Sequence, residues 1–139
     1  MSHVSKIELE INDLETLEAA CASLGLQFVR NQKTYTWYGE YMGDTPLPED
    51  FSANDLGKCD HAVRVPGATY EVGVVRKDGK YFLLWDFWRD GGLERALGPG
   101  AGKLKQAYAV ERVKREARLK GYRVQQSKSV KGIRLVLSM

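Results

Sequence analysis

The stretch from Tyr70 to Trp88 constrains the fold more than any other part of the chain. Two apolar runs, residues 70–75 and 81–88, flank a short polar segment that contains Asp78-Gly79. An Asp-Gly pair supplies the positive φ angles that a tight hairpin turn needs. The second run carries five aromatic side chains in eight residues, enough bulk to bury one face of a sheet. We therefore expect a β-hairpin here, at the centre of the core.

The flanking segments predict two helices and further strands. Residues 6–11 alternate apolar and charged side chains, as a half-buried strand does. Asn12 stands three residues before Glu15, which predicts a capping box and a helix that ends at Gly25. A second helix is expected over 103–120. Further strands are expected within the ranges 26–42, 61–65, 122–128 and 133–137.

This order of elements favours an α+β fold. Consecutive strands predict a mainly antiparallel sheet, and the two separated helices would cover one face of it. We expect a ferredoxin-like relative with inserted strands. The chain length of 139 residues predicts a single domain, 1–139. Residues 43–58 combine prolines and glycines with an acidic excess, so they are predicted to form a surface loop or insertion.

The charge is unevenly distributed along the chain. Residues 1–70 carry 5 Lys and Arg against 11 Asp and Glu, whereas residues 71–139 carry 16 against 7. In many proteins, such acidic and basic regions form solvent-exposed faces or lie facing one another. Alternatively, the basic half forms a surface for an anionic partner.

Membrane and secretory features are not predicted. No apolar run approaches the roughly 18 residues of a membrane span. The first residues lack a basic region followed by an apolar run. We therefore expect a soluble cytoplasmic protein without a membrane partner, in which Cys21 and Cys59 are free thiols.

Two segments resemble chemical motifs without completing them. Residues 98–104 are similar to a phosphate loop, but Leu97 stands where the first glycine is required and Leu104 where a magnesium-binding hydroxyl is required. Either Lys103 and free backbone N–H groups hold an anion there, or the segment simply joins two helices. Cys59-Asp60-His61 offers three ligand types, and Cys59 and His61 would share a face of a strand. Too few other Cys and His residues exist for a zinc site, so we expect no metal, no cofactor and no catalytic residue.

Asp86 is the most unusual carboxylate, because it lies between Trp85 and Phe87 in the central hairpin. In a regular strand it shares a face with Leu84 and Trp88. A surface or edge position would explain it simply. The functional interpretation is a polar group in a pocket formed by Asp86, His61 and Trp88.

The second helix carries the residues for which we predict anion or nucleic-acid binding. Its apolar arc is expected to contain Ala109, Val110, Val113 and Ala117, with Leu104, Tyr108 and Leu119 on the other side. The candidate cations are Lys103, Lys105, Arg112, Arg115 and Arg118. Aromatic residues at 35, 37, 38 and 41 could serve as stacking platforms for single-stranded nucleic acid, or as packing within a sheet. The basic-aromatic octapeptide of RNA-recognition domains is absent.

Both ends of the chain resemble a family of conserved proteins of unknown function. It is the Ycf-type family numbered thirty-five, found in plastid and cyanobacterial genomes, with bacterial and phage members. The resemblance lies in the opening residues 1–7 and in four later segments, 13–17, 103–109, 121–124 and 133–137. Residues 43–58, in contrast, depart from the short plastid forms. It implies no catalytic residue. Because family members are often encoded near AAA-type ATPases, it implies a partner or accessory role.

The first hypothesis is therefore a non-enzymatic binding or accessory module that acts through protein contacts, with an AAA-type ATPase as one partner. The alternative is that the basic C-terminal helix binds nucleic acid or a phosphorylated ligand. The oligomeric state is not predicted by any pattern in the chain.

Overall fold

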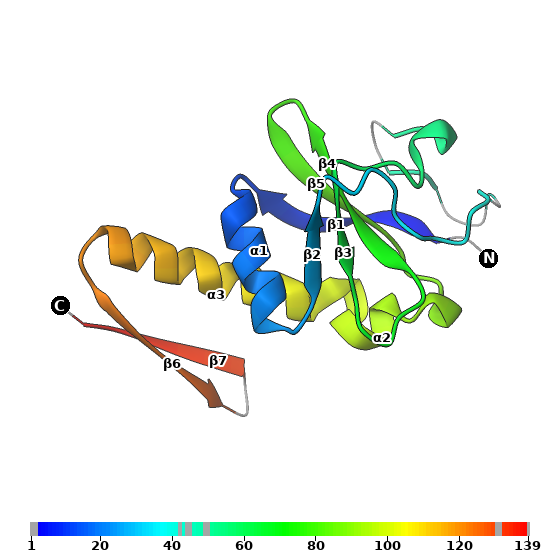
Figure 1. Ribbon diagram of the computed structural model, residues 1–139. Coiled ribbons are helices and arrows are strands. Elements are labelled where there is room, and N and C mark those ends of the chain that lie inside the picture. The colour runs from blue at the N-terminus through cyan, green and yellow to red at the C-terminus, as the bar shows by residue number, and fades with distance from the viewer. Residues whose placement is uncertain (1–2, 42, 44–45, 49–50, 130–131, 139) are drawn as a thin grey trace.

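A five-stranded sheet and a separate two-stranded hairpin organise the computed structural model, which describes residues 3–41, 43, 46–48, 51–129 and 132–138 (Figure 1). The strands are β1 Val4–Ile11, β2 Gln27–Arg30, β3 His61–Arg64, β4 Glu71–Lys77, β5 Lys80–Asp86, β6 Arg123–Ser129 and β7 Gly132–Ser138. The helices are α1 Leu14–Ser23, α2 Leu93–Leu97 and α3 Gly102–Leu119, with 3-10 turns η1 Ala53–Asp55, η2 Arg89–Gly91 and η3 Pro99–Ala101. None of the described helices is long and apolar enough to cross a membrane.

The main sheet has the order β1-β5-β4-β3-β2, and every neighbouring pair is antiparallel. The predicted α+β class is confirmed. Helix α1 connects β1 to β2, which run parallel at opposite edges with three strands between them. This is a split β-α-β unit with inserted strands. In contrast to a ferredoxin-like fold, the closing strands β6 and β7 pair with one another and do not join the main sheet.

The central hairpin is confirmed as β4 and β5. Lys77 pairs with Lys80, which leaves Asp78 and Gly79 as the two turn residues. Their φ angles are 54° and 78°, the left-handed values that this turn requires. Helix α1 also forms as expected, but its N-cap is Asp13 rather than Asn12. The Asp13 carboxylate accepts hydrogen bonds from the Glu15 N–H at 3.0 Å and the Thr16 hydroxyl at 2.7 Å.

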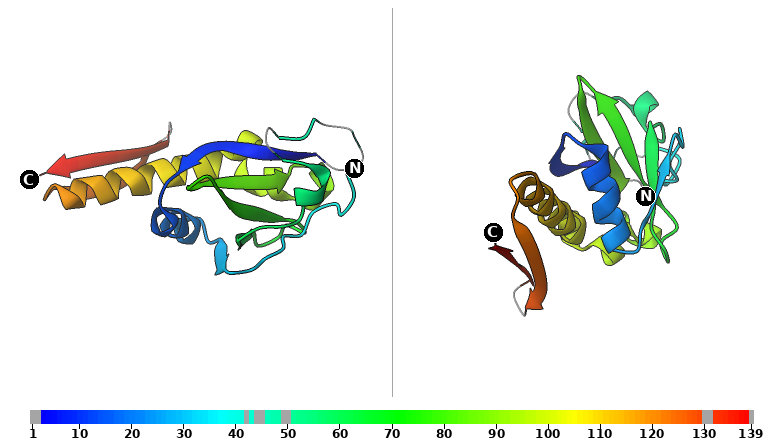
Figure 2. Two further views of the ribbon diagram at one scale, coloured as in Figure 1. Left: turned by 90° about the horizontal axis from the view of Figure 1, so that it is seen from above. Right: turned by 60° about the vertical axis from the view of Figure 1, so that its left-hand side comes forward.

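Different parts of the chain cover the two faces of the main sheet (Figure 2). Helices α1 and α3 cover one face, where Leu17 and Leu104 meet Val74, Leu83 and other core residues. Segment 31–60, so far as it is described, lies over the other face, and we call it the covering loop. There, buried Tyr35 and Cys59 pack against the sheet residues Ala62 and Leu84 and form the loop-covered cluster. The sheet is therefore buried on both faces.

The expected strands in 26–42 are mostly wrong, because only Gln27–Arg30 pairs within the sheet. Asn31 has a φ of 64°, which turns the chain out of the strand direction. Tyr35 then packs its ring onto the face of the sheet at Gly73, where no side chain occupies the space. The aromatic residues that predicted pairing therefore form a cover instead.

The predicted apolar arc of α3 is also partly wrong. Leu104 and Tyr108 are 0% and 4% exposed, whereas Val113 is 39% exposed. The first half of α3 packs on α1 and the sheet, whereas its second half extends beyond the sheet and meets the start of α1 through Arg115 (Figure 1). The burial of an α3 residue therefore depends on its position along the axis as well as on its angle around it. The β6–β7 hairpin lies beside this second half, on the side of α3 away from β1.

Candidate functional site

Asp86 is fully buried and bonded to the backbone. Its Oδ1 atom accepts hydrogen bonds from the N–H groups of His3 at 2.9 Å and Trp88 at 3.0 Å, and Oδ2 accepts one from the Tyr38 N–H at 3.0 Å. These three donors belong to the N-terminal segment, the covering loop and the end of β5. The surface or edge position is therefore wrong, and Asp86 holds three segments together. Three charge-assisted bonds also account for its burial without a ligand.

The expected grouping of Asp86 with His61 is wrong, because the two lie on opposite faces of the sheet. His61 pairs with Val74, which belongs to the helix-covered core, and its ring is 5.7 Å from that of Phe28. Asp86 lies on the face of Leu84, which the loop covers. Trp88 contacts Asp86 through its backbone N–H, while its ring lies 5.2 Å from that of His3.

Cys59 and His61 do not share a face either. Asp60 donates its N–H to the Val74 carbonyl at 2.8 Å, although His61 is the residue paired with Val74. This extra residue interrupts the alternation of side chains, as a β-bulge does. Cys59 consequently points into the loop-covered cluster, where its Sγ atom lies 3.1 Å from the Gln32 carbonyl oxygen.

The acid–base properties of this segment do not favour nucleophilic chemistry. Burial raises the pKa of the Cys59 thiol to about 11, so little thiolate exists near neutral pH. Burial lowers the pKa of His61, whose Nδ1 accepts a hydrogen bond from the Asn31 N–H at 2.9 Å. Within the described part of the chain, no three His, Cys, Asp or Glu residues gather as a metal site would require.

The phosphate-loop-like segment joins two helices. Gly98 and Gly100 have positive φ angles, and Ala101 is fully buried where the chain passes from η3 into α3. Helix α2, not a strand, precedes the segment. This arrangement supports the interpretation of 98–104 as a helix–helix connection, with Lys103 exposed at the start of α3.

The five predicted cations of α3 do not form one patch. At about 100° per residue, Lys103 and Arg112 lie on opposite sides of the helix. Arg115 forms ion pairs with Asp13 and with Glu15, the latter at 3.0 Å, and so joins α3 to the start of α1. Arg118 also lies apart from Arg112. Lys105 and Arg112 do share a side of α3, but Lys105 is only half-exposed.

The predicted aromatic platforms are mainly packing residues. Tyr35 is 3% exposed, and burial raises the pKa of its phenol to about 12. Its hydroxyl has no hydrogen-bond partner among the described residues. Trp37 packs against the same loop-covered cluster. Tyr38 is 41% exposed, and its backbone is fixed by Asp86. A row of stacking surfaces is therefore not formed.

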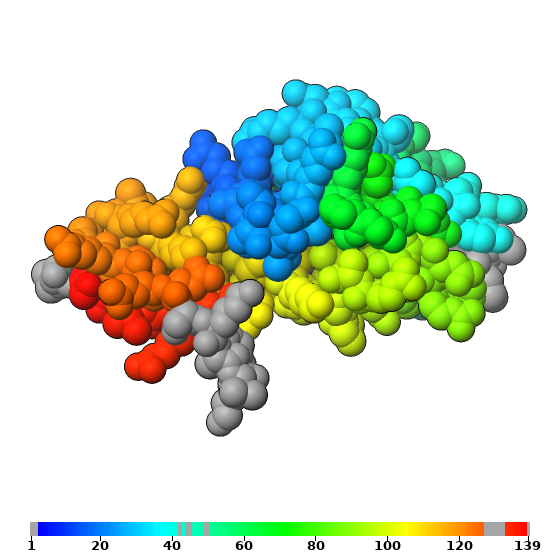
Figure 3. Space-filling view, turned by 60° about the horizontal axis from the view of Figure 1, so that its bottom comes forward, coloured from blue at the N-terminus to red at the C-terminus, as the bar shows by residue number. Residues whose placement is uncertain are grey.

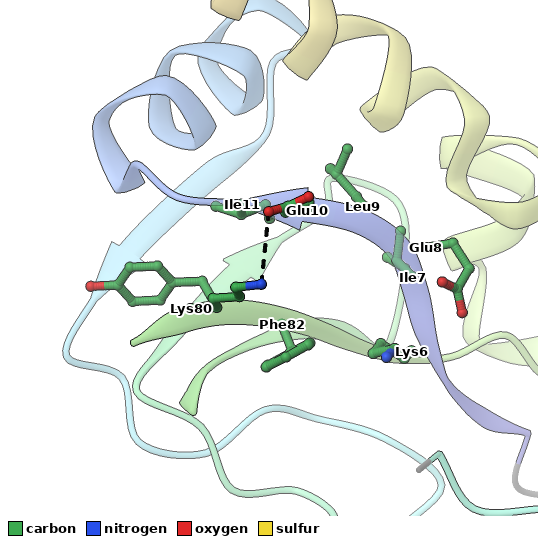
Figure 4. Close-up of a pocket in the computed structure, with 9 residues that line it drawn as sticks. Lys6, Ile7, Glu8, Leu9, Glu10, Ile11, Lys80 and Phe82 are labelled. Atoms are coloured by element: carbon green, nitrogen blue, oxygen red, sulfur yellow. Dashed lines mark ion pairs between the residues drawn. The ribbon is translucent and has the colours of Figure 1, made fainter. Parts of the chain in front are cut away.

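A hollow that sequence patterns do not predict opens beside β1 (Figure 4). Ile7 pairs with Leu83 and Ile11 with Tyr81, so residues 8–10 of β1 lie opposite the single residue Phe82. The ladder is disrupted there, leaving a hollow of about 340 Å³. Lys80 Nζ closes one end at 3.9 Å from Glu10 Oε1. The regular alternation of residues 6–11 conceals this bulge, which arises only from pairing with β5.

Two further hollows continue this one along α3. The next, of about 330 Å³, shares Leu9 and Glu10 with the first and is otherwise lined by α3. The last, of about 170 Å³, reaches the start of α1 and Leu119. We call the three together the β1–α3 furrow. Its lining on the α3 side, from the second and third hollows, comprises Tyr108, Ala109, Arg112, Val113, Arg115, Glu116 and Leu119.

The furrow combines apolar surface with charges of both signs. Leu9 and Tyr108 contribute apolar atoms, as does the exposed side chain of Val113. Glu10 and Glu116 lie beside Arg112, which has no hydrogen bond or ion pair to any described residue. Such a surface can bind an amphipathic polypeptide segment by burying its apolar side chains and pairing its charges.

Comparisons with known proteins do not identify the chain. No protein-family model, curated protein or solved structure matches it. The resemblance to the Ycf-type family therefore stays a prediction, and the function is argued from the surfaces described above.

Proposed function

We propose that this protein is a non-enzymatic binding module that holds a segment of a partner protein in the β1–α3 furrow. The observation that supports this is the linkage of three hollows through shared lining residues. Leu9 and Glu10 belong to the first and second hollows, and Tyr108, Arg112 and Glu116 to the second and third. Together they make a long, open surface along two elements.

An elongated furrow favours a polypeptide over a small molecule. Small-molecule sites are usually concave and bury most of the ligand. A helix or extended segment instead contacts a groove along its length through regularly spaced apolar anchors. Val113 at 39% exposure and Leu119 at 83% exposure offer such contacts along α3. Arg112, which lines both the second and the third hollow, would pair with an acidic side chain of the segment.

The first candidate partner is an AAA-type ATPase, which the resemblance to the Ycf-type family implies. Site-specific crosslinking tests the proposal without assuming that identity. A photoreactive amino acid at Val113, inside the furrow, should capture the partner in an extract of the source cells. The same amino acid at Arg118, exposed on α3 outside the furrow, is the matched control.

The captured protein should then be purified and its affinity measured by calorimetry. Val113→Glu places a charge against the apolar segment and should weaken binding by about tenfold or more, corresponding to about 1.4 kcal/mol. Arg118→Glu should change affinity by less than about twofold. Equal capture from both positions, or equal affinities of the two variants, would reject the furrow as the binding surface. Circular dichroism checks that both variants remain folded.

A further inference from the structure

The C-terminal part of the molecule carries a concentrated net positive charge. We call residues 112–138 the arm; it comprises the second half of α3 and the β6–β7 hairpin. The arm has nine Lys and Arg against one Glu, a net charge of +8, whereas the whole chain has only +3. Figure 3 shows the hairpin and the end of α3 standing out at one end of the molecule. A charge so concentrated creates a strong local potential that attracts anions.

The register of the hairpin places its two described arginines on one face, which we call the basic face, and four of its five apolar residues on the other. Arg123 pairs with Ser138, Gln125 with Val136 and Ser127 with Arg134. Directly opposed residues share a face, so Arg123 and Arg134 lie on the same side of the ribbon. Both are exposed. They are about 13 Å apart along the strands, at about 3.3 Å per residue.

The other face of the ribbon is more apolar and partly covered. Val124, Ile133 and Leu135 lie on it and are half-buried. Contacts between the hairpin and α3 account for this cover. The basic face is therefore directed outward, and Arg118 and Lys120, exposed at the end of α3, add charge at the base of the ribbon. Arg123 and Arg134 have no ion pair with any described residue.

We propose that the outward face of the arm binds double-stranded DNA, with the β6–β7 ribbon lying in a groove. The phosphate backbone is a dense array of negative charge that complements the arm. The major groove of B-form DNA is wide enough to admit a two-stranded ribbon, whereas that of an RNA duplex is deep and narrow. Backbone contacts of this kind carry no sequence information.

Two other occupants fit the arm less well. Proteins that bind single strands stack bases on aromatic side chains, but Tyr122 is the only aromatic residue of the arm. An acidic protein surface would match the charge. It would not, however, require two arginines spaced along a projecting ribbon. The arm and the β1–α3 furrow share part of α3, including Arg112 and Arg115, but Arg123 and Arg134 do not line the furrow. Substitutions at these two arginines therefore test the inference separately from the proposed function.

Fluorescence anisotropy with a short labelled DNA duplex tests the inference on the full chain. Arg123→Gln plus Arg134→Gln should weaken binding at about 50 mM salt by about tenfold or more. It should also reduce the slope of log affinity against log salt by about 2, because two phosphate contacts are lost. Arg76→Gln plus Arg95→Gln removes the same charge from exposed positions outside the arm and should change affinity by less than about twofold. Arg123→Lys plus Arg134→Lys should retain most of the binding.

Several outcomes would overturn the inference. These are no binding at low salt, tighter binding to a single strand than to the duplex, or equal losses in the two Gln variants. Displacement of the duplex by poly-glutamate at the same charge concentration would show general attraction to acidic polymers instead of DNA recognition. Amide hydrogen exchange of β6 and β7 checks that the hairpin persists in each variant.

Discussion

The five-stranded sheet and the β6–β7 hairpin are both antiparallel, but they differ in what surrounds them. The sheet is covered by helices α1 and α3 on one face and by segment 31–60 on the other. The main contacts of the hairpin are with α3, and none of its described residues belongs to either core cluster. Val136 and Leu137 remain 40% and 46% exposed. An isolated two-stranded hairpin is marginally stable in water.

This contrast assigns different roles to polar residues in the two regions. In the sheet, Asp86 and Glu71 hold the covering loop in place; Glu71 Oε1 accepts a hydrogen bond from the Thr36 N–H at 2.9 Å. In the arm, Arg115 forms ion pairs with Asp13 and Glu15, whereas Arg123 and Arg134 of the hairpin have no ion pair with any described residue. Polar groups of the rest of the chain, which we call the body, therefore contribute to stability, whereas the arginines of the hairpin are available for binding. Four predictions test this division, beginning with the largest effect.

The largest effect is expected from Asp86→Ala. This change removes a fully buried carboxylate and leaves three part-buried backbone N–H groups without their acceptor, so the free energy of unfolding should fall by about 3–5 kcal/mol. Urea denaturation followed by tryptophan fluorescence measures it. Arg134→Ala in the arm is the control and should change stability by less than about 0.5 kcal/mol. Similar losses in both variants would contradict the division between body and arm.

The second effect concerns the cover over the sheet. A Cβ atom added at Gly73 would overlap the ring of Tyr35, so Gly73→Ala should destabilise the protein by about 1–3 kcal/mol. Gly102→Ala is the matched control, because nothing lies near its added Cβ and alanine favours the helix that begins there. Thermal unfolding compares the two. An unchanged midpoint of thermal unfolding for Gly73→Ala would show that the packing of the Tyr35 ring does not depend on the missing side chain at Gly73.

The third effect is pH-dependent and tests the start of α1. The Thr16 hydroxyl lowers the pKa of Asp13, and the Glu15 N–H and the Arg115 side chain lower it further. A carboxylate with a depressed folded pKa stabilises the protein above its unfolded pKa and loses that contribution as pH falls through the folded value. Near neutral pH, Asp13→Asn should be less stable by at most about 1 kcal/mol. This difference should narrow as the pH falls below about 4, the ordinary pKa of an Asp carboxyl, as urea titrations can show. A difference that widens on acidification would contradict the assignment.

The smallest effect is expected from removing the hairpin. A chain that ends after Lys120 retains every buried residue of the two described core clusters. Its free energy of unfolding should therefore change by less than about 0.5 kcal/mol. All three tryptophans lie in the body, so their fluorescence reports on the sheet in both chains. A large loss of stability would show that the arm and the sheet fold as one unit.

Local patterns predicted the elements whose pairing partners are close in sequence. The central hairpin forms because Asp78-Gly79 favours its turn and large apolar residues on both sides can meet directly. Helix α1 forms because a cap, apolar periodicity and Gly25 agree. In 26–42 the same reasoning failed. Strand-forming aromatic residues there pack on a face of the sheet, and whether they pair or cover depends on distant Gly73.

The candidate surfaces depended more strongly on tertiary structure. The basic residues of the second half of the chain were evident from the sequence, but their distribution around α3 and across the hairpin was not. The furrow requires the bulge in β1, and that bulge exists only because β5 pairs with it in a shifted register.

The sequence by itself determined the α+β class, the central hairpin and the concentration of positive charge toward the C-terminus, because these follow from local propensity and composition. Only the tertiary structure decided that Asp86 is buried, that it lies on the opposite face from His61 and that β6–β7 stands apart from the main sheet. Such features depend on contacts between segments far apart in the chain, and no short pattern encodes which segments will meet.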